Sequence, residues 1–149
     1  MPPTDAPRIL IADDLRPNAD LLAEYLDGTG WEWRIAADGE QTLREVAAWK
    51  PDLVLLDVMM PKHSGFEVCK RLRAAPATRS IAVLMVTALD QPSDIERAVE
   101  AGTDDFMAKP IEQEELLRRV RALLASRDRP GDLERTLSYI ENVQKEPGP

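Results

Sequence analysis

Five short apolar runs, each followed by a helix-like segment, constrain the fold of this chain more than any other feature. The runs are 8-RILIA-12, 31-WEWRIAA-37, 53-LVLLD-57, 81-IAVLMVT-87 and 104-DDFMA-108. The third and fourth runs are almost continuously apolar, which is typical of parallel strands that are buried on both faces. The regular alternation predicts an α/β fold with a doubly wound, five-stranded parallel sheet and helices on both of its faces.

The segments between the runs have the periodicity and the end signals of amphipathic helices. Their apolar stripes consist of Leu15, Leu22 and Leu26 in the first segment and of Leu43, Val46 and Ala47 in the second. Ser64 with Glu67, and Ser93 with Glu96, have the spacing of capping boxes and predict the starts of the third and fourth helices. Gly102 follows the fourth segment and predicts its end.

A chain of 149 residues with 44% apolar and 31% charged residues suits one globular domain with a short appendage. Residues 1–6 are predicted to be a flexible N-terminus. The stretch 126-SRDRPG-131 is typical of a linker, and the rest of 126–149 is predicted to contain a short C-terminal helix at 132–145. The apolar stripe of that helix is Leu133, Leu137 and Ile140, far too short to establish a coiled coil.

Composition also excludes several classes of protein. No run of about 18 apolar residues is present, so no membrane span is expected. The first residues lack the order of a signal peptide, and the single cysteine, Cys69, fits a reducing cytoplasm, with Cys69 itself expected to be a small buried or half-buried helix residue. The net charge of −8 argues against direct binding of nucleic acid by this chain.

The polar residues of interest lie where the predicted strands end. Asp13 and Asp14 follow the first run, Asp57 ends the third, Thr87 ends the fourth, and Lys109 follows the fifth. In doubly wound sheets, ligands bind outside the carboxyl ends of the strands, where the strand order reverses. We therefore expect all five side chains to face one crevice. His63, a lone histidine in a loop, is predicted to face solvent and receives no catalytic role.

Three carboxylates at one point predict a bound cation. Two unit charges about 4 Å apart repel by roughly 4 kcal/mol at an effective dielectric constant near 20, and a divalent cation offsets that cost. Oxygen ligands favour Mg²⁺, with Asp14 and Asp57 as ligands and Asp13 acting through water. The carboxylate of Asp57 can then attack phosphorus, while Lys109 neutralises oxygen charge and Thr87 donates a hydrogen bond.

Over about residues 7–125 the chain resembles the receiver domain of bacterial two-component response regulators. The matching motifs are 9-ILIADD-14, 53-LVLLDVMMPKHSGFE-67, 83-VLMVTA-88 and 102-GTDDFMAKP-110. Each motif alone is weak, but all four in this order are highly specific. The resemblance implies a sheet of strand order 2-1-3-4-5 and a phosphoacceptor function that is not enzymatic beyond the domain's own phosphorylation and dephosphorylation.

The resemblance also implies the roles of individual residues. Asp57 would take a phosphoryl group from a sensor histidine kinase or a phosphotransfer protein. Mg²⁺, for which Mn²⁺ could substitute, would be held by Asp14, Asp57 and the backbone carbonyl of Met59, with Asp13 positioning its waters. The bond between Lys109 and Pro110 would be cis.

Two further expectations concern switching and lifetime. In the family, an aromatic ring at the position of Phe106 turns inward when the threonine, here Thr87, moves toward the phosphoryl group. Phenylalanine lacks the hydroxyl of the common tyrosine, so a switch here would depend on packing. Met59 and Leu89 lie two positions after Asp57 and Thr87, beside the path of attacking water. Because both are apolar, we expect a long-lived phosphoryl group on Asp57.

Other classes of protein fit the sequence less well. A haloacid-dehalogenase-type phosphatase expects a second aspartate two residues after the nucleophile, where this chain has Met59. A flavin-binding module expects a phosphate-cradling loop after the first strand, for which 13-DDLRPN-18 is unsuitable.

The output of the receiver stays open in the sequence. The segment after residue 125 is too short for a helix-turn-helix domain. The chain is therefore either a stand-alone receiver that acts through a protein partner or the receiver of a longer regulator without its effector domain. Homodimerisation through the fourth helix, fifth strand and fifth helix is the common mode of the family. Charges available for it are Arg97, Asp104, Asp105 and Arg119.

Overall fold

A computed structural model of the chain describes residues 6–89, 91–126 and 140. Its strands are β1 (Arg8–Ala12), β2 (Glu32–Ala36), β3 (Leu53–Leu56), β4 (Ala82–Thr87) and β5 (Asp105–Ala108). Its helices are α1 (Arg16–Leu26), α2 (Gly39–Trp49), α3 (Gly65–Ala74), α4 (Pro92–Ala101) and α5 (Gln113–Ser126). The strands form one parallel sheet of order β2-β1-β3-β4-β5, which confirms the predicted fold and strand order.

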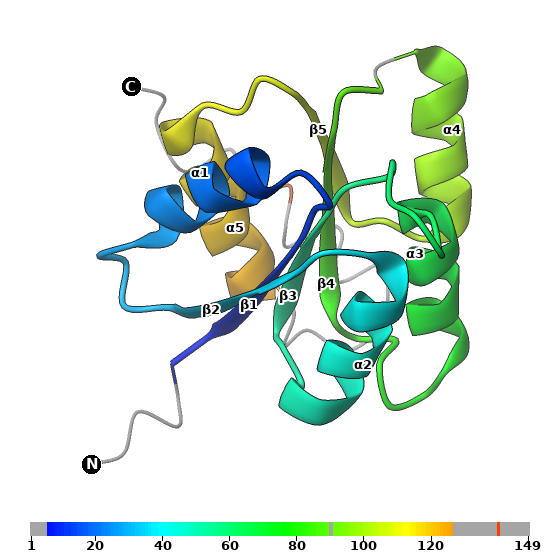
Figure 1. The fold of residues 1–149 in the computed structure, drawn as a ribbon, viewed down its shortest axis with the longest axis horizontal. Helices are drawn as coiled ribbons and strands as arrows, with labels where there is room; N and C mark the ends of the chain where they lie inside the picture. Colours follow the sequence, from blue (N-terminus) through cyan, green and yellow to red (C-terminus); the bar gives the residue numbers. More distant parts are fainter. Residues whose placement is uncertain (1–5, 90, 127–139, 141–149) are drawn as a thin grey trace.

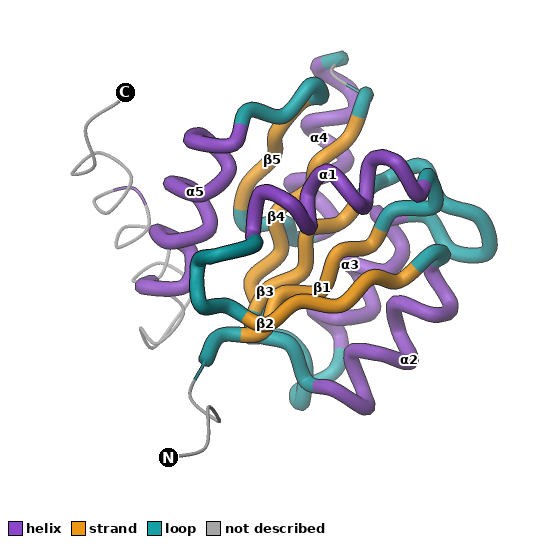
Figure 2. Tube along the Cα trace, turned by 60° about the vertical axis from the view of Figure 1, so that its left-hand side comes forward, coloured by secondary structure: helices purple, strands orange, loops and turns teal. Residues whose placement is uncertain are grey.

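Helices cover both faces of the sheet, as Figures 1 and 2 show. Apolar side chains of α1 and α5 form one buried cluster with one face of the strands, and those of α2, α3 and α4 form a second with the other face. Strand β3 contributes to both: Leu53 and Leu55 belong to the first cluster, Val54 and Leu56 to the second. Burial on both faces explains why this run of the sequence is continuously apolar.

Helix starts follow local signals, and the predictions there are right in part. The hydroxyl of Ser64 accepts a hydrogen bond from the amide of Glu67 at 3.2 Å, as expected at the start of α3. The prediction for α4 was wrong. Pro92, with its fixed φ, begins that helix, so Ser93 lies within the first turn, and Asp94 Oδ2 accepts the bond from the Gln91 amide at 3.2 Å.

Two of the predicted apolar stripes also need correction. Leu15 precedes α1 in an extended conformation and is 56% exposed, because α1 begins only at Arg16, with Pro17 next to it. In α2, Ala47 is exposed, whereas Trp49 is buried and its ring lies beneath the guanidinium group of Arg34.

One arginine of α3 holds together the end of the sheet that lies away from the crevice. The Arg73 guanidinium donates to the carbonyls of Gly102 (2.8 Å), Arg79 (2.8 Å) and Ile81 (2.6 Å) and to Asp104 Oδ2 (2.7 Å). Asp104 Oδ2 also accepts the amide of Val83 at 2.8 Å. Arg73 therefore joins α3, the start of β4 and the loop between α4 and β5.

The C-terminal boundary differs slightly from the prediction. Helix α5 continues through Ser126, whose buried hydroxyl donates to the Ala122 carbonyl at 2.8 Å, so residue 126 belongs to the helix and not to a linker. The predicted flexible N-terminus and the predicted linker and helix after residue 126 lie, except for Ala6 and Ile140, outside the described residues. In the described part of the chain, no helix is both long and apolar enough to cross a membrane.

Cys69 is a core residue of α3, as predicted. Its side chain is fully buried in the cluster with α2 and α4. Burial raises the pKa of the thiol to about 11, slightly opposed by the positive charge of Arg73. The thiol is thus protonated and inaccessible in the folded chain.

Candidate functional site

The register of the three central strands brings their carboxyl ends to one point. Ala12 of β1 lies beside Leu56 of β3, which lies beside Met85 of β4. The Asp57 amide donates to the Ala12 carbonyl at 2.9 Å, which extends the ladder past the end of β3. Asp57 is only 4% exposed, and its Oδ1 accepts the Met59 amide at 3.3 Å.

Glycine at position 65 permits this arrangement of Asp57. A Cβ atom at Gly65 would lie 2.4 Å from the Asp57 carbonyl oxygen and 2.8 Å from the Val58 Cα. The Gly65 amide donates to the Val58 carbonyl at 2.9 Å, so the start of α3 packs directly against the backbone that carries the aspartate.

Three carboxylates converge at the predicted crevice. Oxygen atoms of Asp13, Asp14 and Asp57 all lie within 4.8 Å of one another. Asp13 is buried, with its amide bonded to the Ala36 carbonyl at 3.1 Å, whereas Asp14 is exposed. This set of hard oxygen donors, open to solvent on the side of Asp14, fits a divalent cation such as Mg²⁺.

Lys109 reaches into the same cluster from the end of β5. Its Nζ lies 2.9 Å from Asp13 Oδ2 and 3.5 Å from Asp57 Oδ2, and the side chain is 19% exposed. The Lys109 amide donates to the Thr87 carbonyl at 2.8 Å, and the bond to Pro110 is cis. A single ammonium group thus faces two of the three carboxylates.

Three residues near Asp57 differ in their burial: Thr87, and the two positions expected to control the lifetime of phosphoryl-Asp57, Leu89 and Met59. Thr87 is buried at the end of β4, and its hydroxyl accepts the Leu89 amide at 3.3 Å. Leu89 is partly buried against the core cluster of α2, α3 and α4. Met59 is 60% exposed, so its apolar side chain lies in solvent beside the acceptor.

The surroundings of Asp57 disfavour its charged form. Burial raises the pKa of this carboxyl above its ordinary value of 3.8, and the neighbouring Asp13 raises it further. The positive charge of Lys109 and hydrogen bonds from the Met59 amide and the Thr87 hydroxyl oppose the rise without cancelling it. The folded chain therefore holds a carboxylate at a position that costs stability unless a cation compensates it.

This cost predicts a pH-dependent effect of Asp57→Asn. The unfolded chain ionises Asp57 near pH 3.8, and the folded chain only at higher pH, so wild type loses stability as pH rises through that interval. Asparagine does not titrate. Without divalent cations, we expect the variant to be more stable at pH 7 by about 0.5–2 kcal/mol, and the difference to shrink toward pH 4.

Urea unfolding between pH 4.5 and 8 measures this difference. Adding Mg²⁺ should raise the stability of wild type more than that of the variant, because only wild type keeps all three carboxylates. The prediction would be contradicted if wild type were more stable than Asp57→Asn at pH 7 in the absence of metal.

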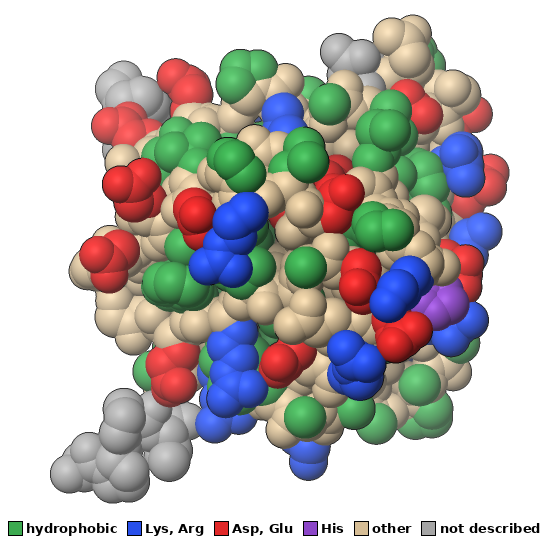
Figure 3. All heavy atoms as spheres, viewed as in Figure 1, with side chains coloured by type: hydrophobic (Ala, Val, Ile, Leu, Met, Phe, Trp, Pro, Cys, Tyr) green, Lys and Arg blue, Asp and Glu red, His purple; other side chains and the backbone are tan. Residues whose placement is uncertain are grey.

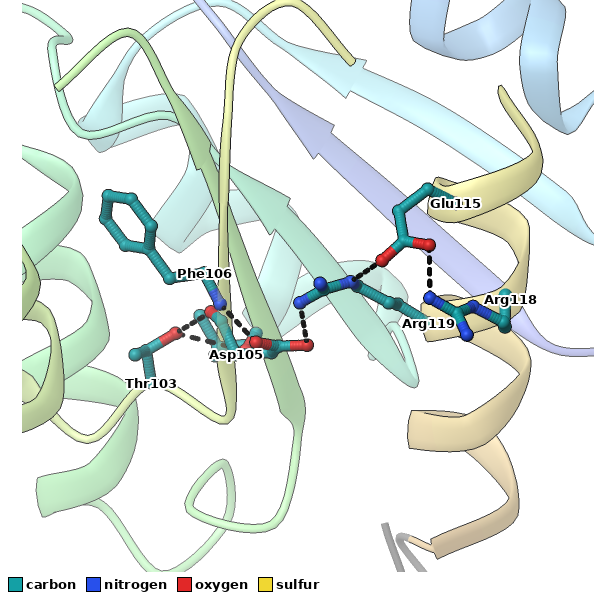
Figure 4. A network of polar contacts seen from close by, with 7 residues as sticks. Thr103, Asp105, Phe106, Glu115, Arg118 and Arg119 are labelled. Carbon is teal, nitrogen blue, oxygen red and sulfur yellow. Dashed lines mark hydrogen bonds and ion pairs between the residues drawn. The ribbon is translucent and has the colours of Figure 1, made fainter. Parts of the chain in front are cut away.

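The predicted switch residue lies beside a polar network. Phe106 is partly buried and packs against the core cluster of α2, α3 and α4. Its amide donates to Asp105 Oδ1 at 2.8 Å, Asp105 Oδ2 accepts from Arg119 at 2.8 Å, and Arg119 bonds Glu115 at 2.6 Å (Figure 4). Burial opposes ionisation of Glu115, but bonds from Arg119 and Arg118 outweigh it and lower the pKa of Glu115.

The charges expected for a homodimer largely have partners within the chain. Asp104 pairs with Arg73 at 2.7 Å, and Asp105 pairs with Arg119 at 2.8 Å. The Arg97 guanidinium lies 4.3 Å from the centre of the Phe66 ring. The sequence pattern could not distinguish these intrachain contacts from intermolecular ones.

His63 lies in a loop at the surface, as predicted, but its side chain also has a partner within the chain. Its side chain is 24% exposed and its Nδ1 lies 2.7 Å from Glu67 Oε2. The backbone around it also packs closely, since a Cβ atom at Gly39 would lie 2.3 Å from the His63 carbonyl oxygen. His63 thus helps to fix the loop between β3 and α3 against the start of α2.

An apolar groove that no sequence pattern had indicated lies beside the crevice. Its volume is about 400 Å³, and it is lined by Asn18, Leu21, Leu22, Tyr25, Lys109, Pro110 and Ile111. The Tyr25 hydroxyl donates to the Ile111 carbonyl at 3.0 Å and links α1 to the segment before α5. The signal for it was Leu21, an apolar residue outside the predicted stripe of α1, which is 41% exposed.

Comparisons with known proteins agree with this geometry. A family model described as the response regulator receiver domain matches residues 9–121. The chain is 45% identical to the DNA-binding dual master transcriptional regulator RpaA of Synechocystis sp. over 123 residues, which are 83% of this chain and 51% of RpaA. It is 44% identical to the response regulator PleD of Caulobacter vibrioides over 116 residues, 78% of this chain and 26% of PleD.

Solved structures show the same similarity. The signal receiver domain of a signal transduction histidine kinase from Syntrophus aciditrophicus superposes with a TM-score of 0.78 at 34% identity, over 85% of this chain and 96% of that chain. The chain spans about half the length of RpaA and about a quarter of PleD.

Proposed function

Because this chain belongs to the response regulator receiver family, we propose that it is the phosphoacceptor module of a two-component phosphorelay, with Asp57 as the acceptor. Receiver domains are signalling modules and are not generally classed as enzymes. The observation that carries the proposal is the meeting of Asp13, Asp14 and Asp57 with the ammonium group of Lys109 at the carboxyl end of the sheet.

Asp14, Asp57 and the backbone carbonyl of Met59 would hold Mg²⁺ or Mn²⁺, with Asp13 acting through water. When bound, the ion would supply positive charge opposite the phosphoryl oxygens. The donor set supports this assignment, because the three carboxylates repel one another and only Lys109 compensates them among the described residues around the cluster.

The proposed reaction is transfer of a phosphoryl group from a phosphohistidine of the donor. An oxygen of Asp57 forms a bond to phosphorus, the bond from phosphorus to the imidazole nitrogen breaks, and the imidazole leaves with the bonding electron pair. Lys109 neutralises charge on the phosphoryl oxygens, and the Thr87 hydroxyl, whose oxygen accepts the Leu89 amide, donates its own proton to one of them.

The groove beside Lys109 supports docking of the phosphoryl donor. It is lined mainly by apolar residues of α1 and by Pro110 and Ile111, next to the crevice that holds Asp57. A sensor histidine kinase or phosphotransfer protein that places an apolar surface there would bring its histidine toward the acceptor.

Signal output would use the surface around α4, β5 and α5. Thr87 and Phe106 are the proposed switch residues, and packing of the Phe106 ring would differ between the two states. The partner is a separate protein or an effector domain of a longer regulator. The curated relatives favour the second, since the chain spans about half of RpaA, a DNA-binding regulator. Homodimerisation of this surface remains a family-based alternative.

A phosphatase of the haloacid-dehalogenase type is disfavoured. Met59 occupies the position at which that class needs its second aspartate, and its side chain cannot act as an acid or base.

The proposed acceptor can be tested by native mass spectrometry of the full chain with Mg²⁺ and acetyl phosphate. We expect a phosphoryl adduct on wild type and none on Asp57→Asn. Asp20→Asn, at an exposed carboxylate of α1, is the matched control and should be phosphorylated like wild type. An unchanged adduct on Asp57→Asn would exclude Asp57 as the acceptor.

The lifetime of phosphoryl-Asp57 should shorten when Met59 is replaced by asparagine. An amide at this exposed position can orient water toward phosphorus, whereas the thioether cannot. We expect loss of phosphate from Met59→Asn to be faster by roughly tenfold, on the scale of a weak general acid-base contribution. The rate is measured by intact-mass spectrometry after removal of the donor.

A matched control is Val99→Asn, because Val99 is 68% exposed on α4, a helix that does not contribute to the carboxylate cluster. Its phosphate loss should equal that of wild type. Equal rates for Met59→Asn and wild type would refute the proposed role of Met59.

A further inference from the structure

The outer edge of β2 has backbone groups oriented for pairing with another strand. The Glu32 amide donates to the Pro7 carbonyl at 2.9 Å, and the Ala36 carbonyl accepts the Asp13 amide at 3.1 Å. Since hydrogen-bonding direction alternates along a parallel strand, the even-numbered residues of β2 bond β1, while the N–H and C=O groups of Trp33 and Ile35 point outward. In Figures 1 and 2, α1 and α2 flank β2, and no described element lies across its outer side.

The opposite edge of the sheet is protected. The Phe106 amide of β5 is bonded to Asp105 Oδ1, and Arg119 of α5 holds that aspartate from the side (Figure 4). Native proteins commonly block edge strands in such ways, because an open edge recruits other strands. On β2, side chains cap the outward amides at the two ends, since the Trp31 amide donates to Thr29 and the Ala37 amide to Gln41. The centre of β2, at Trp33 and Ile35, is therefore the part of that edge that can accept a further strand.

The exposed side chains of β2 are complementary to themselves. The sequence around its centre is 32-EWR-34, and Trp33 is 39% exposed, unusual for so large an aromatic ring. An antiparallel copy of β2 with its twofold axis at Trp33 places Trp33 opposite Trp33 of the second copy. Glu32 then lies opposite Arg34 of the second copy, and Arg34 opposite its Glu32, on one face of the joined sheet.

The hydrogen-bonding direction agrees with this register. Trp33 and Ile35 both have outward N–H and C=O groups, so two copies of Trp33 would form a hydrogen-bonded pair. The Ile35 amide could also donate to the Trp31 carbonyl of the second copy, whereas the Trp31 amide already donates to Thr29 Oγ1 at 3.1 Å. The Glu32–Arg34 pairs fall at the positions between these, where opposing side chains are closest.

The guanidinium group of Arg34 is already held at the edge. It lies 4.8 Å from the centre of the Trp49 ring and 3.1 Å from Glu45 Oε1 through one nitrogen. Arginine has further N–H groups in its planar fork, so it can bond a second carboxylate without leaving Glu45.

On the face that includes β2, acidic and basic side chains are interspersed, with no broad patch of one sign (Figure 3).

We propose that a second copy of this chain binds the outer edge of β2 in antiparallel register about Trp33, which joins the two sheets into one. The interface is isologous and uses both open edges, so it closes at a dimer and does not propagate. It is separate from α4, β5 and α5, and it requires neither a metal nor phosphorylation of Asp57. Its test is therefore independent of the proposed phosphoacceptor function.

Sedimentation equilibrium of the unphosphorylated full chain, from micromolar to millimolar concentration, measures the association. Glu32→Arg places two arginines opposite each other at both pairs, and Arg34→Glu places two glutamates there. We expect each single change to weaken dimerisation at least about tenfold, because every pair occurs twice. The double change Glu32→Arg with Arg34→Glu restores opposite charges and should bring the dissociation constant back to within about threefold of wild type.

Two further variants complete the test. Arg44→Glu, in an exposed pair with Glu40 on α2, changes the net charge as Arg34→Glu does and should leave dimerisation unchanged. Trp33→Thr keeps a strand-forming residue and removes the aromatic pair, so it should weaken the dimer even if a charge variant unfolds. The proposal would be overturned if the chain stayed monomeric up to millimolar concentration. It would also be overturned if the charge variants dimerised as tightly as wild type, or if association continued beyond a dimer.

Discussion

Replacing Gly65 by alanine is expected to destabilise the chain by about 3 kcal/mol or more, because the added methyl group has no room. Its Cβ would lie 2.4 Å from the Asp57 carbonyl oxygen and 2.8 Å from the Val58 Cα, and neither backbone atom can yield as a flexible side chain can. Relief requires α3 to move away from the loop that carries Asp57. We therefore expect weaker phosphorylation by acetyl phosphate as well as a lower free energy of unfolding in urea.

Gly28→Ala separates this steric effect from the general cost of replacing a glycine. Gly28 has a φ of +83°, and a Cβ atom added to it would have no neighbour within 4 Å, so only backbone conformation opposes the change. That cost is about 1 kcal/mol, and the site should be unaffected. If Gly65→Ala were no more destabilising than Gly28→Ala, the close approach of α3 to Asp57 would contribute little to stability.

The second large effect is expected for Arg73→Ala, with a loss of about 2–4 kcal/mol. Arg73 donates to three carbonyl groups and to Asp104, and its side chain is 22% exposed. Its removal leaves the three carbonyl groups without this donor and the Asp104 carboxylate without its counter-ion, with only the Val83 amide still bonded to Oδ2. Urea unfolding monitored by circular dichroism measures the loss.

Arg71→Ala, two residues earlier in the same helix, is the matched control. Arg71 is 55% exposed and pairs only with Glu67 in the described structure, an arrangement worth less than about 0.5 kcal/mol. Similar losses for the two arginines would show that the contacts of Arg73 contribute no more than an ordinary surface ion pair.

The fold followed from patterns that act locally along the chain. Each predicted strand lies within two residues of the observed one, because a run such as 53-LVLLD-57 must be buried on both faces. The start of α4 was predicted wrongly because Ser93 and Glu96 have capping-box spacing, yet Pro92 begins the helix one residue earlier. Ala47 was placed in the core because periodicity cannot distinguish it from Trp49, whose larger ring reaches the sheet.

The site was predictable to the extent that it depends on strand ends. Asp13, Asp57 and Thr87 come together because parallel strands present their carboxyl ends at one edge, and this rule applies to any such sheet. Their mutual positions were not predictable. The 2.9 Å contact of Lys109 with Asp13, closer than its 3.5 Å contact with Asp57, depends on how the loop after β5 returns over the sheet.

The order of amino acids was sufficient to establish the alternation of elements, the buried strands and the identity of the residues at the carboxyl end of the sheet. These properties depend on hydrophobic period and chain direction, which are local. Three other properties emerged only from the assembled fold: Asp104 and Asp105 pair within the chain, Gly65 packs against Asp57, and the two sheet edges differ. Each of these depends on contacts between residues far apart in the chain, or on the direction of a backbone group within the sheet.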